Sequence, residues 1–369
     1  MRIKILECIR QGQIGGGESH LLSLVENLDK AIYEPVVLSF TEGPMIDRLK
    51  EMGIKTYVIH TEKPFDISKW KQVKKLLQEE KIALVHAHGT RATSNVFQPA
   101  RSLGLPVIYT IHGWSFHDDQ NPVIKKIRIW SEKYLTSRMN VNISVSESNK
   151  RSGRKYFDSF DSVVVNNGID QEKFNPARYF KDVRAELGIA KEVTLILFIA
   201  RFTSHKQPLT LIRAFSKAIK EAPGLKLLMV GDGDQKNEAL EMIKEAGLEK
   251  EIYLQPFRQD VPDVLAAADV FVLPSLWEGL PIGLLEAMSM GKAVIGTDVD
   301  GTSEVISDKV NGLLTEPGNI VALANAIVLL SRDETIRNRL SESAKATVKN
   351  RFNASVMTRE IEKIYAGLL

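Results

Sequence analysis

Two glutamates near the start of one predicted helix are the residues whose types and spacing best suit ligand chemistry. Glu278 and Glu286 follow an apolar run, Val270–Leu273, that is typical of a buried strand. Pro281 suits the first position of a helix, and Gly291 suits its end. Glu278 should therefore lie in the loop before the helix, and Glu286 about a turn and a half inside it.

The backbone around these acids also suits a ligand. The amides of Gly279 and Leu280 should lie near the helix N-terminus, where they can face a ligand, and Gly283 should leave room for close approach. In a plain structural alternative, the first acid complements the helix dipole and the second is solvated. The close spacing of glycines, proline and two acids favours a binding loop.

A glycine-rich loop at residues 12–18 follows the first predicted strand and opens the first predicted helix. Glycines there let the backbone approach a ligand, and amides at a helix N-terminus attract anions. The dinucleotide fingerprint fails because His20 stands where its last glycine is required, and the P-loop fails because Glu18 replaces its lysine. A hydride-transferring or ATP-dependent enzyme is therefore disfavoured, and a tight strand-to-helix turn is the simpler alternative.

Several histidines and aspartates raise the question of a metal site. They are His86, His88, His112, His117, Asp118 and Asp119. His86 and His88 alternate along a predicted strand and therefore share one of its faces. The spacing matches no standard zinc pattern, so the sequence predicts no metal. His88 either contacts an acceptor or has a structural role, and we favour the structural role.

The stretch at residues 121–134 combines basic, aromatic and apolar side chains with helical spacing. Lys125, Lys126 and Arg128 could hold such a helix on an anionic membrane. The alternative is an ordinary helix with a solvated basic face. Peripheral membrane contact through residues 125–133 is therefore a hypothesis to test.

The elements that must position these residues alternate regularly. Short runs rich in Val and Ile predict strands buried on both faces of a parallel sheet. In the first half of the chain these runs are Ile3–Ile9, Pro35–Phe40, Lys55–Ile59, Ala83–Ala87, Val107–Ile111 and Val141–Val145. Amphipathic segments such as Glu18–Leu28 and Ser68–Glu79 lie between them. This alternation predicts βαβ units in a doubly wound sheet.

The same rhythm restarts after a turn-rich segment near residue 170. The later strands are predicted at Leu195–Ala200, Lys226–Val230, Glu251–Leu254, Val270–Leu273 and Ala293–Gly296. We therefore predict an α/β protein with two Rossmann-like domains, at residues 1–170 and 171–352, and a last helix, at residues 353–369, that crosses back to the first domain. Two such domains should face a ligand cleft at the carboxyl ends of their strands.

The composition is that of a globular protein of two-domain length. The chain has 369 residues, 44% of them hydrophobic and 26% charged, which excludes a disordered chain or a collagen-like fibre. A formal net charge of +3 disfavours a nucleic-acid partner. Cys8 is the single cysteine, so no intramolecular disulfide can form. Because signal-peptide and membrane-spanning patterns are also lacking, we expect a cytoplasmic protein that can associate with the inner face of the cell membrane.

The stretch from Pro274 to Met288 resembles the E-x7-E motif of the large retaining glycosyltransferase family of the GT-B fold, family four. The resemblance extends along nearly the whole chain. Its further pieces, in chain order, are Gly15–Glu18, Val85–His88, Thr110–Gly113, Asn167–Pro176, Ala200–Lys206 and Gly231–Gly233. Their order and intervals are specific for the family and much less so for the sugar.

The resemblance implies transfer from a nucleotide-diphosphate sugar with retention at the anomeric carbon. The implied catalytic residues are His112, Glu278, Arg201 and Lys206. The implied donor-binding residues are Gly16, Gly17, Arg201, Lys206, Pro256, Phe257, Arg258, Glu278, Gly279, Leu280, Pro281, Ile282 and Glu286. The implied acceptor-binding residues are Gly17, His88 and His112. The family pattern requires no metal if cations neutralise the diphosphate.

Individual roles also follow from the resemblance. Arg201 and Lys206 contact the diphosphate, and Glu286 accepts hydrogen bonds from the ribose hydroxyls. Glu278 holds the sugar hydroxyls, and His112 reaches the 6-position of the sugar and the reacting centre. Residues 256–258 pass the base. The family usually has Lys-Gly where this chain has Lys206 followed by Gln207, a departure that should stiffen the turn.

We therefore predict a metal-independent retaining glycosyltransferase that needs no cofactor. It would move a hexose or N-acetylhexosamine from a nucleotide sugar, with UDP the expected nucleotide, to a saccharide or lipid-linked acceptor in bacterial surface polysaccharide or glycolipid synthesis. The departing diphosphate would deprotonate the acceptor in a front-face mechanism, with a covalent route as the alternative. The rival functions are a nucleotide-sugar epimerase, disfavoured by the E-x7-E context, and a nucleotide-sugar-binding protein, disfavoured because Glu278, Arg201 and Lys206 are all present.

Overall fold

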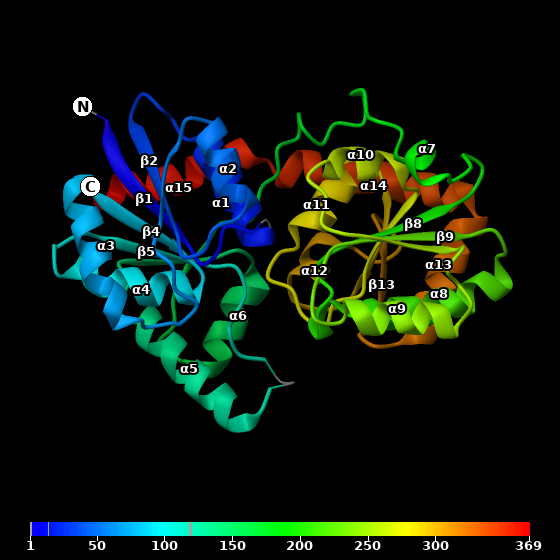
Figure 1. Cartoon of the computed structure of the whole chain (residues 1–369), viewed down its shortest axis with the longest axis horizontal. Coiled ribbons are helices and arrows are strands. Elements are labelled where there is room, and N and C mark those ends of the chain that lie inside the picture. Colours follow the sequence, from blue (N-terminus) through cyan, green and yellow to red (C-terminus); the bar gives the residue numbers. More distant parts are fainter. Residues whose placement is uncertain (1, 14, 118–119) are drawn as a thin grey trace. The chain divides into compact units, whose positions relative to one another are not determined.

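The computed structural model of the protein describes residues 2–13, 15–117 and 120–369. Two compact units divide the chain (Figure 1). The first comprises Met1–Gly168 and Ala354–Leu369, and the second comprises Ile169–Asn353. Each unit is a parallel sheet with helices on its faces, which confirms the prediction of two Rossmann-like α/β domains.

The sheet of the first unit has the strand order β3-β2-β1-β4-β5-β6-β7. Its strands are β1 (Ile3–Ile9), β2 (Tyr33–Ser39), β3 (Lys55–Val58), β4 (Leu84–His88), β5 (Val107–Ile111), β6 (Val141–Ser144) and β7 (Val163–Val164). The chain runs outward from β1 to β3 and then returns to the other side of β1 with β4. In such sheets ligands bind at the carboxyl ends of the strands where the order reverses, here between β1 and β4.

Helices cover both faces of this sheet. They are α1 (Gly16–Asn27), α2 (Pro44–Glu51), α3 (Ile67–Glu79), α4 (Thr90–Arg101), α5 (Pro122–Thr136), α6 (Glu147–Tyr156) and α15 (Ala354–Leu368). The side chains of Asp66, Asn121 and Ser146 cap α3, α5 and α6 by accepting hydrogen bonds from backbone N–H groups. The chain's last helix, α15, belongs to this unit, as the sequence predicted.

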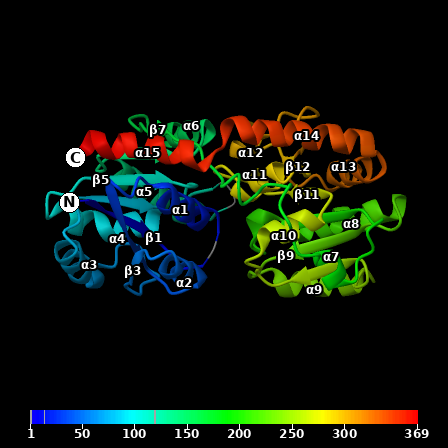
Figure 2. The ribbon, with the colours of Figure 1, turned by 90° about the horizontal axis from the view of Figure 1, so that it is seen from above.

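Alternate residues of β1 belong to two different cores. Ile5 packs with Leu24 of α1 and Ile361 of α15, whereas Leu6 and Cys8 pack with residues of α3 and α4. Figure 2 shows the strands between α15 and the pair of α3 and α4. Because successive side chains of a strand point to opposite faces, Glu7 lies on the same face as Ile5, towards α15.

The sheet of the second unit has the order β10-β9-β8-β11-β12-β13, which reverses between β8 and β11. Its strands are β8 (Leu195–Ile199), β9 (Lys226–Val230), β10 (Ile252–Gln255), β11 (Val270–Leu273), β12 (Ala293–Thr297) and β13 (Leu313–Thr315). Every strand predicted from the sequence is present with its ends shifted by two residues or fewer, whereas β13 was not predicted.

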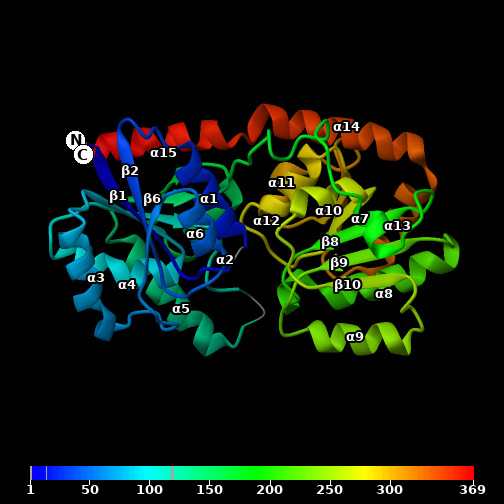
Figure 3. The same cartoon turned by 45° about the horizontal axis from the view of Figure 1, so that its top comes forward.

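Helices also cover the second sheet on both faces. They are α7 (Val183–Leu187), α8 (Pro208–Glu221), α9 (Lys236–Glu245), α10 (Val261–Ala267), α11 (Ile282–Ser289), α12 (Asp300–Val305), α13 (Ile320–Arg332) and α14 (Glu334–Arg351), with a short 3-10 helix at Ser204–Lys206. Figure 3 shows α8 and α9 on one side of the sheet and α10 and α11 on the other. Within the described ranges, no helix has both the length and the apolar character needed to cross a bilayer.

Candidate active site

The predicted cation and acid of the second unit form an ion pair beside the point where its strand order reverses. Lys206 ends the 3-10 helix that follows β8, and Glu278 lies in the loop that follows β11. Lys206 Nζ donates to Glu278 Oε1 at 2.5 Å, and Ser275 Oγ donates to the same oxygen at 2.6 Å. The Lys206 side chain is 18% exposed and that of Glu278 is 9% exposed. The pair is therefore sheltered yet within reach of a ligand.

Direct contacts tie the two loops that carry this pair into one structure. The backbone N–H of Leu276 donates to the carbonyl oxygen of His205 at 2.8 Å. The rings of His205 and Trp277 stack with centroids 4.1 Å apart and an interplanar angle of 11°. Thr297 Oγ1 donates to the carbonyl oxygen of Ser275 and anchors the same loop to β12. The positions of Lys206 and Glu278 are thus set together.

Two glycines permit close backbone approaches around this site. A Cβ added to Gly301, in α12, would lie 1.9 Å from the carbonyl oxygen of Gly279. A Cβ added to Gly231, which has a φ of +146°, would lie 2.0 Å from the carbonyl oxygen of Ala200. Gly283, which the sequence suggested as a close-approach residue, has no protein atom nearer than 3.8 Å to such a Cβ. The structure therefore places the steric need within the protein at Gly231 and Gly301, whereas the space beside Gly283 is open, and the ligand approach expected there stays a prediction.

The residue after Lys206 adopts a backbone conformation that suits glycine. Gln207 has a φ of +55° and a ψ of +45°. This is a left-handed backbone conformation that residues other than glycine and asparagine rarely adopt. The side-chain Nε2 of Gln207 donates to the carbonyl oxygen of Ser204 at 2.6 Å, and its Oε1 accepts from Thr210 Oγ1. These bonds hold the strained residue in place directly after Lys206.

Glu286 lies on α11 and is half-buried. Helix α11 begins at Ile282, with Pro281 as its N-cap, one residue later than the sequence predicted. Burial raises the pKa of Glu286 to about 7, and the nearby charge of Lys173 only partly opposes that shift. The carboxyl group therefore exchanges its proton near neutral pH.

The predicted base-binding segment, residues 256–258, contains an arginine that is held by ion pairs and a phenylalanine ring that is exposed. Arg258 donates from Nη1 to Glu186 Oε1 at 2.5 Å and from Nη2 to Asp260 Oδ2 at 2.6 Å, so its guanidinium already holds two carboxylates. Phe257 is 37% exposed, and Pro256 is also exposed. Arg201, after β8, is exposed as well. The role of residues 256–258 in binding a base remains a prediction.

In the first unit the glycine loop supports a histidine. Gly17 lies in the first turn of α1, and a Cβ added to it would lie 3.3 Å from Cδ2 of His112. A Cβ added to Gly16 would meet no heavy atom within 4 Å. Gly17 therefore makes room for the His112 ring, whereas Gly16 is left open towards any ligand of the loop.

Behind this loop lies a buried polar group that we call the histidine cluster. It consists of Glu7, His20, His86, His88, Thr110, His112, Asn167 and Tyr365. Strands β1, β4 and β5 are neighbours in the sheet and bring Glu7, His86 and Thr110 to one face, which α1 and α15 cover. The sheet order, together with the last helix, therefore assembles the cluster.

Hydrogen bonds connect the cluster from one end to the other. Glu7 Oε1 accepts from the Tyr365 hydroxyl at 2.6 Å, and Glu7 Oε2 accepts from His88 Nε2 at 2.9 Å. His88 Nδ1 lies 3.0 Å from His112 Nε2. His20 Nδ1 lies 2.9 Å from Asn167 Oδ1. His112, a predicted catalytic residue, is thus one end of a chain that begins at Glu7.

The charges in this cluster are set by burial and by neighbours. Burial and the adjacent histidines lower the pKa of His20 to about 3 and that of His88 to about 4, and they lower the pKa of His112 well below its usual value. Burial alone would raise the pKa of Glu7, but the charges and hydrogen bonds of His86 and His88 lower it below its usual range. At neutral pH the Glu7 carboxylate therefore lies among the neutral rings of His20, His88 and His112.

Nitrogen and oxygen atoms of the cluster are close enough together to raise the question of a metal. Ligand atoms of His20, His88 and His112 lie within 4.8 Å of one another, as do those of Glu7, His86 and His88. Both nitrogens of His88 are engaged, however, one with Glu7 and one with His112. A metal would therefore have to displace existing hydrogen bonds. Two further residues considered from the sequence, Asp118 and Asp119, lie outside the described residues.

Family models match both halves of the chain. A model described as Glycosyltransferase Family 4 covers residues 14–173, and one described as Glycosyl transferases group 1 covers residues 180–347. The chain belongs to glycosyltransferase family 4. As a member of this family it is a glycosyltransferase that uses a nucleotide sugar, which confirms that part of the prediction.

Individual relatives of this glycosyltransferase act in several contexts. The UDP-Gal:alpha-D-GlcNAc-diphosphoundecaprenol alpha-1,3-galactosyltransferase of Escherichia coli is 28% identical over 100% of this chain and 98% of its own. The N-acetyl-alpha-D-glucosaminyl L-malate synthase of Bacillus anthracis is 24% identical over 86% of this chain and 84% of its own. A crystal structure of HepE from Anabaena, in complex with UDP and glucose, has a TM-score of 0.88 at 23% identity over 100% of both chains. That likeness confirms the GT-B fold.

Sequence reasoning placed some residues of the glycosyltransferase correctly and missed others. It predicted that His86 and His88 share a face, and their ring centroids lie 4.2 Å apart. It assigned no role to Glu7, His20 or Tyr365. A signal for Glu7 was available, because an acid between the apolar residues Leu6 and Cys8 must find hydrogen-bond donors if both faces of the strand are buried. No local pattern could have indicated its partner Tyr365, 358 residues away.

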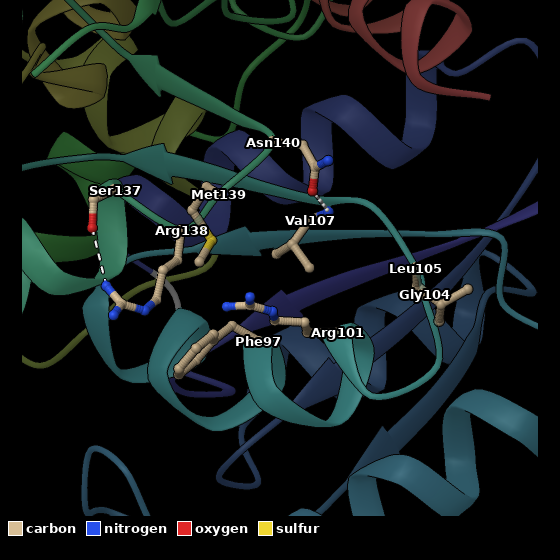
Figure 4. Close-up of a pocket in the computed structure, with 9 residues that line it drawn as sticks. All are labelled: Phe97, Arg101, Gly104, Leu105, Val107, Ser137, Arg138, Met139 and Asn140. Atoms are coloured by element: carbon tan, nitrogen blue, oxygen red, sulfur yellow. Dashed lines mark hydrogen bonds between the residues drawn. The ribbon is translucent and has the colours of Figure 1, made fainter.

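One hollow of the glycosyltransferase lies apart from these residues. It measures about 630 Å³ and is lined by Phe97, Arg101, Gly104, Leu105, Val107, Ser137, Arg138, Met139 and Asn140 (Figure 4). Val107 begins β5, so the hollow opens at the amino ends of the strands, whereas His88 ends β4. The hollow thus lies at the amino ends of the strands, whereas His88 and His112 of the histidine cluster lie at or just after the carboxyl ends.

Proposed function

We propose that the protein moves a hexose or N-acetylhexosamine from a UDP-sugar to a hydroxyl of a saccharide or lipid-linked acceptor, with retention at the anomeric carbon and without a resident metal. The observation that carries this proposal is the sheltered pair of Lys206 and Glu278 beside the β8/β11 reversal. Lys206 offers a positive charge for a diphosphate, and the Glu278 carboxylate beside it can accept hydrogen bonds from sugar hydroxyls. The name of the E. coli relative, which includes UDP-galactose and a diphosphoundecaprenol sugar, supports the same chemistry.

The second unit supplies the groups for the donor. Lys206 and Arg201 would neutralise the diphosphate as it departs, and such preorganised charge is the usual way to stabilise a developing anion. Glu278, with the backbone amides of Gly279 and Leu280, would hold the transferred sugar. Glu286, in its ionised form, would accept hydrogen bonds from the ribose hydroxyls. Pro281 and Ile282 would line the same surface, and Phe257 would stack on the base.

In the first unit, Gly16 and Gly17 would approach the diphosphate, and His112 and His88 would lie near the acceptor. In the proposed front-face reaction the acceptor oxygen bonds to the anomeric carbon as the bond to the diphosphate breaks. The acceptor proton passes to the departing phosphate oxygen, so no protein nucleophile is consumed. Retention would be checked by the anomeric coupling constant of the product in proton NMR. An inverted product would contradict the proposed stereochemistry.

Nucleotide preference is tested by thermal unfolding with UDP-, GDP- and ADP-sugars, followed by transfer assays with the best ligand. A ligand at 100 times its dissociation constant should add about 2.7 kcal/mol of stability. We expect this shift with a UDP-sugar, together with release of UDP when a saccharide or polyprenyl-diphosphate sugar is added. Conversion of the nucleotide sugar to an epimer without an acceptor would favour the epimerase instead.

Helix α5 supports a lipid-linked acceptor. Val123, Ile127 and Trp130, one face of the helix, are 65%, 61% and 67% exposed. Lys126 and Arg128 lie on the same exposed helix, which stands out from the lower edge of the first unit in Figure 1. Exposed apolar residues beside basic ones suit the surface of an anionic membrane.

This contact is tested by sedimentation with vesicles that contain phosphatidylglycerol. Neutralising Lys125, Lys126 and Arg128 together should weaken binding roughly 100-fold, at about 1 kcal/mol per charge. The matched control replaces Lys71 and Lys75 of α3 by Gln and should leave binding nearly unchanged. Equal binding by the wild-type protein and the α5 variant would remove the membrane proposal.

A further inference from the structure

The hydrogen bonds of the histidine cluster have a direction, and Glu7 sets it. An ionised carboxylate only accepts hydrogen bonds. Tyr365 must therefore donate its hydroxyl proton to Oε1 over 2.6 Å, and His88 must donate its Nε2–H to Oε2 over 2.9 Å. With Nε2 protonated and the ring neutral, Nδ1 of His88 is an acceptor. His112 must then donate from Nε2 across the 3.0 Å that separates the two nitrogens.

The rest of the cluster is consistent with this direction. His86 Nδ1 lies 2.7 Å from the Tyr365 hydroxyl and 3.2 Å from Glu7 Oε2, so it serves as a donor towards the carboxylate. His86 Nε2 then accepts from Thr110 Oγ1 at 2.7 Å. Donors from β4 and α15 thus point towards Glu7, and the donor from β5 points towards His86. A network of this kind around Glu7 fixes the tautomers of the rings that it holds.

The direction leaves one acceptor unsatisfied at the end of the chain. When Nε2 of His112 carries the ring proton, Nδ1 carries a lone pair. That Nδ1 is buried and has no hydrogen-bond partner in the described part of the chain. A buried acceptor without a partner is unfavourable, and such atoms in native proteins often have a functional explanation. A substrate hydroxyl is a donor of the kind that Nδ1 lacks.

We propose that Glu7 is a positioning residue for glycosyl transfer. Acting through His88, it holds His112 as the Nε2–H tautomer, whose Nδ1 accepts a hydrogen bond from a substrate hydroxyl. His112 touches the substrate, whereas Glu7 does not. The contact with substrate rests on the proposed function, but the tautomer of His112 does not depend on it.

The substitution Glu7→Gln tests this directly because it reverses the chain. The Tyr365 hydroxyl holds the amide oxygen, so the amide N–H faces His88 Nε2, which becomes an acceptor. His88 then donates from Nδ1, and His112 is left with a proton on Nδ1. We expect kcat to fall at least about 100-fold, as expected when a hydrogen-bonded carboxylate no longer sets a histidine tautomer. The KM for the nucleotide sugar should stay within about threefold.

A structural role alone would not change the tautomer, so nitrogen-15 NMR of histidine-labelled protein supplies the second readout. The wild-type protein should show His112 protonated on Nε2, and Glu7→Gln should show it protonated on Nδ1. The matched control is Cys8→Ser, which disturbs the same buried strand from its opposite face. It should lower stability without changing the tautomer or kcat.

Two results would overturn the inference. One is an Nδ1–H form of His112 in the wild-type protein, which needs no variant and no substrate to measure. The other is a folded Glu7→Gln protein with kcat within about threefold of wild type. If the wild-type protein transferred no sugar from any nucleotide sugar, the proposed function would fail, while the NMR measurement would still decide the tautomer.

Discussion

The two units place their functional side chains at equivalent points of similar sheets but in opposite environments. In the first unit the polar groups project from strands into a covered face, so they are buried and bonded to one another. In the second unit Lys206 and Glu278 lie on loops and retain some exposure. A buried network cannot exchange its partners without a large penalty, whereas a loop pair can open to admit a ligand. The buried network is suited to holding side chains in a fixed orientation, and the loop pair is suited to binding a charged substrate.

The units also differ in their expected response to pH. In the first, the pKa values of His20 and His88 lie below the ordinary histidine value of 6.5, so the unfolded chain binds more protons below that pH. In the second, the pKa of Glu286 lies above the ordinary value of 4.5. Acid should therefore destabilise the folded state of the first unit. In the second unit, Glu286 should instead stabilise the folded state at low pH.

The largest expected effect is on turnover. Lys206→Ala and Glu278→Ala should each lower kcat about 10²–10³-fold, because each removes a group that stabilises the transferring sugar or its leaving group. The measurement is steady-state transfer from the nucleotide sugar. The control is Lys226→Ala, which removes an ion pair with Glu251 at the other edge of the same sheet. Near-normal kcat in Lys206→Ala or Glu278→Ala would show that the substituted residue has no catalytic role.

Acid sensitivity of the first unit is the next effect. As pH falls from 6.5 towards 4, each buried histidine should reduce stability by up to about 1.4 kcal/mol per pH unit. A Trp277→Phe protein keeps only Trp70, Trp114 and Trp130, all in the first unit, so its fluorescence reports that unit. Its unfolding midpoint in urea should fall steadily over this range. A midpoint independent of pH would mean that the cluster is not held neutral.

The backbone approach at Gly301 gives a smaller effect on stability. Gly301→Ala would force a Cβ against the carbonyl oxygen of Gly279 and should cost about 1–3 kcal/mol, seen as a lower Tm. Because the strain reaches the Glu278 loop, kcat should fall as well. Gly283→Ala is the matched control, since its Cβ would make only ordinary contacts. Equal Tm values for the two variants would show that the loop yields easily.

The smallest effect concerns Glu286. Its contribution to stability is fully present below pH 4.5 and is lost as pH rises through about 7. Over that range the free energy of unfolding of the wild-type protein should therefore fall relative to that of Glu286→Gln. Affinity for a UDP-sugar, whose diphosphate diester does not titrate there, should rise with pH through about 7 in the wild-type protein only. Calorimetric titrations at pH 6 and pH 8 measure both proteins. A parallel change in the variant would assign the pH dependence to another group.

Much of the fold was predictable because its signals are local. Runs such as Leu195–Ile199 and Val270–Leu273 are apolar over their whole length, as is typical of strands buried on both faces. Strand β13 was missed because Leu313–Thr315 is too short for such a run. Lys206 and Glu278 were recognised by their resemblance to a family motif, but their direct ion pair joins residues 72 positions apart and needed the structure.

The sequence by itself determined the order of the elements, the strands' burial and the placement of chemical residues just after strand ends, because each depends on neighbouring residues in the chain. Only the tertiary structure decided which of those residues meet. The order β2-β1-β4-β5 brings Glu7 beside His86 and His88, and the return of α15 adds Tyr365. Strand order and helix docking are set by packing across long separations, so local patterns could not reveal that Glu7 directs His112.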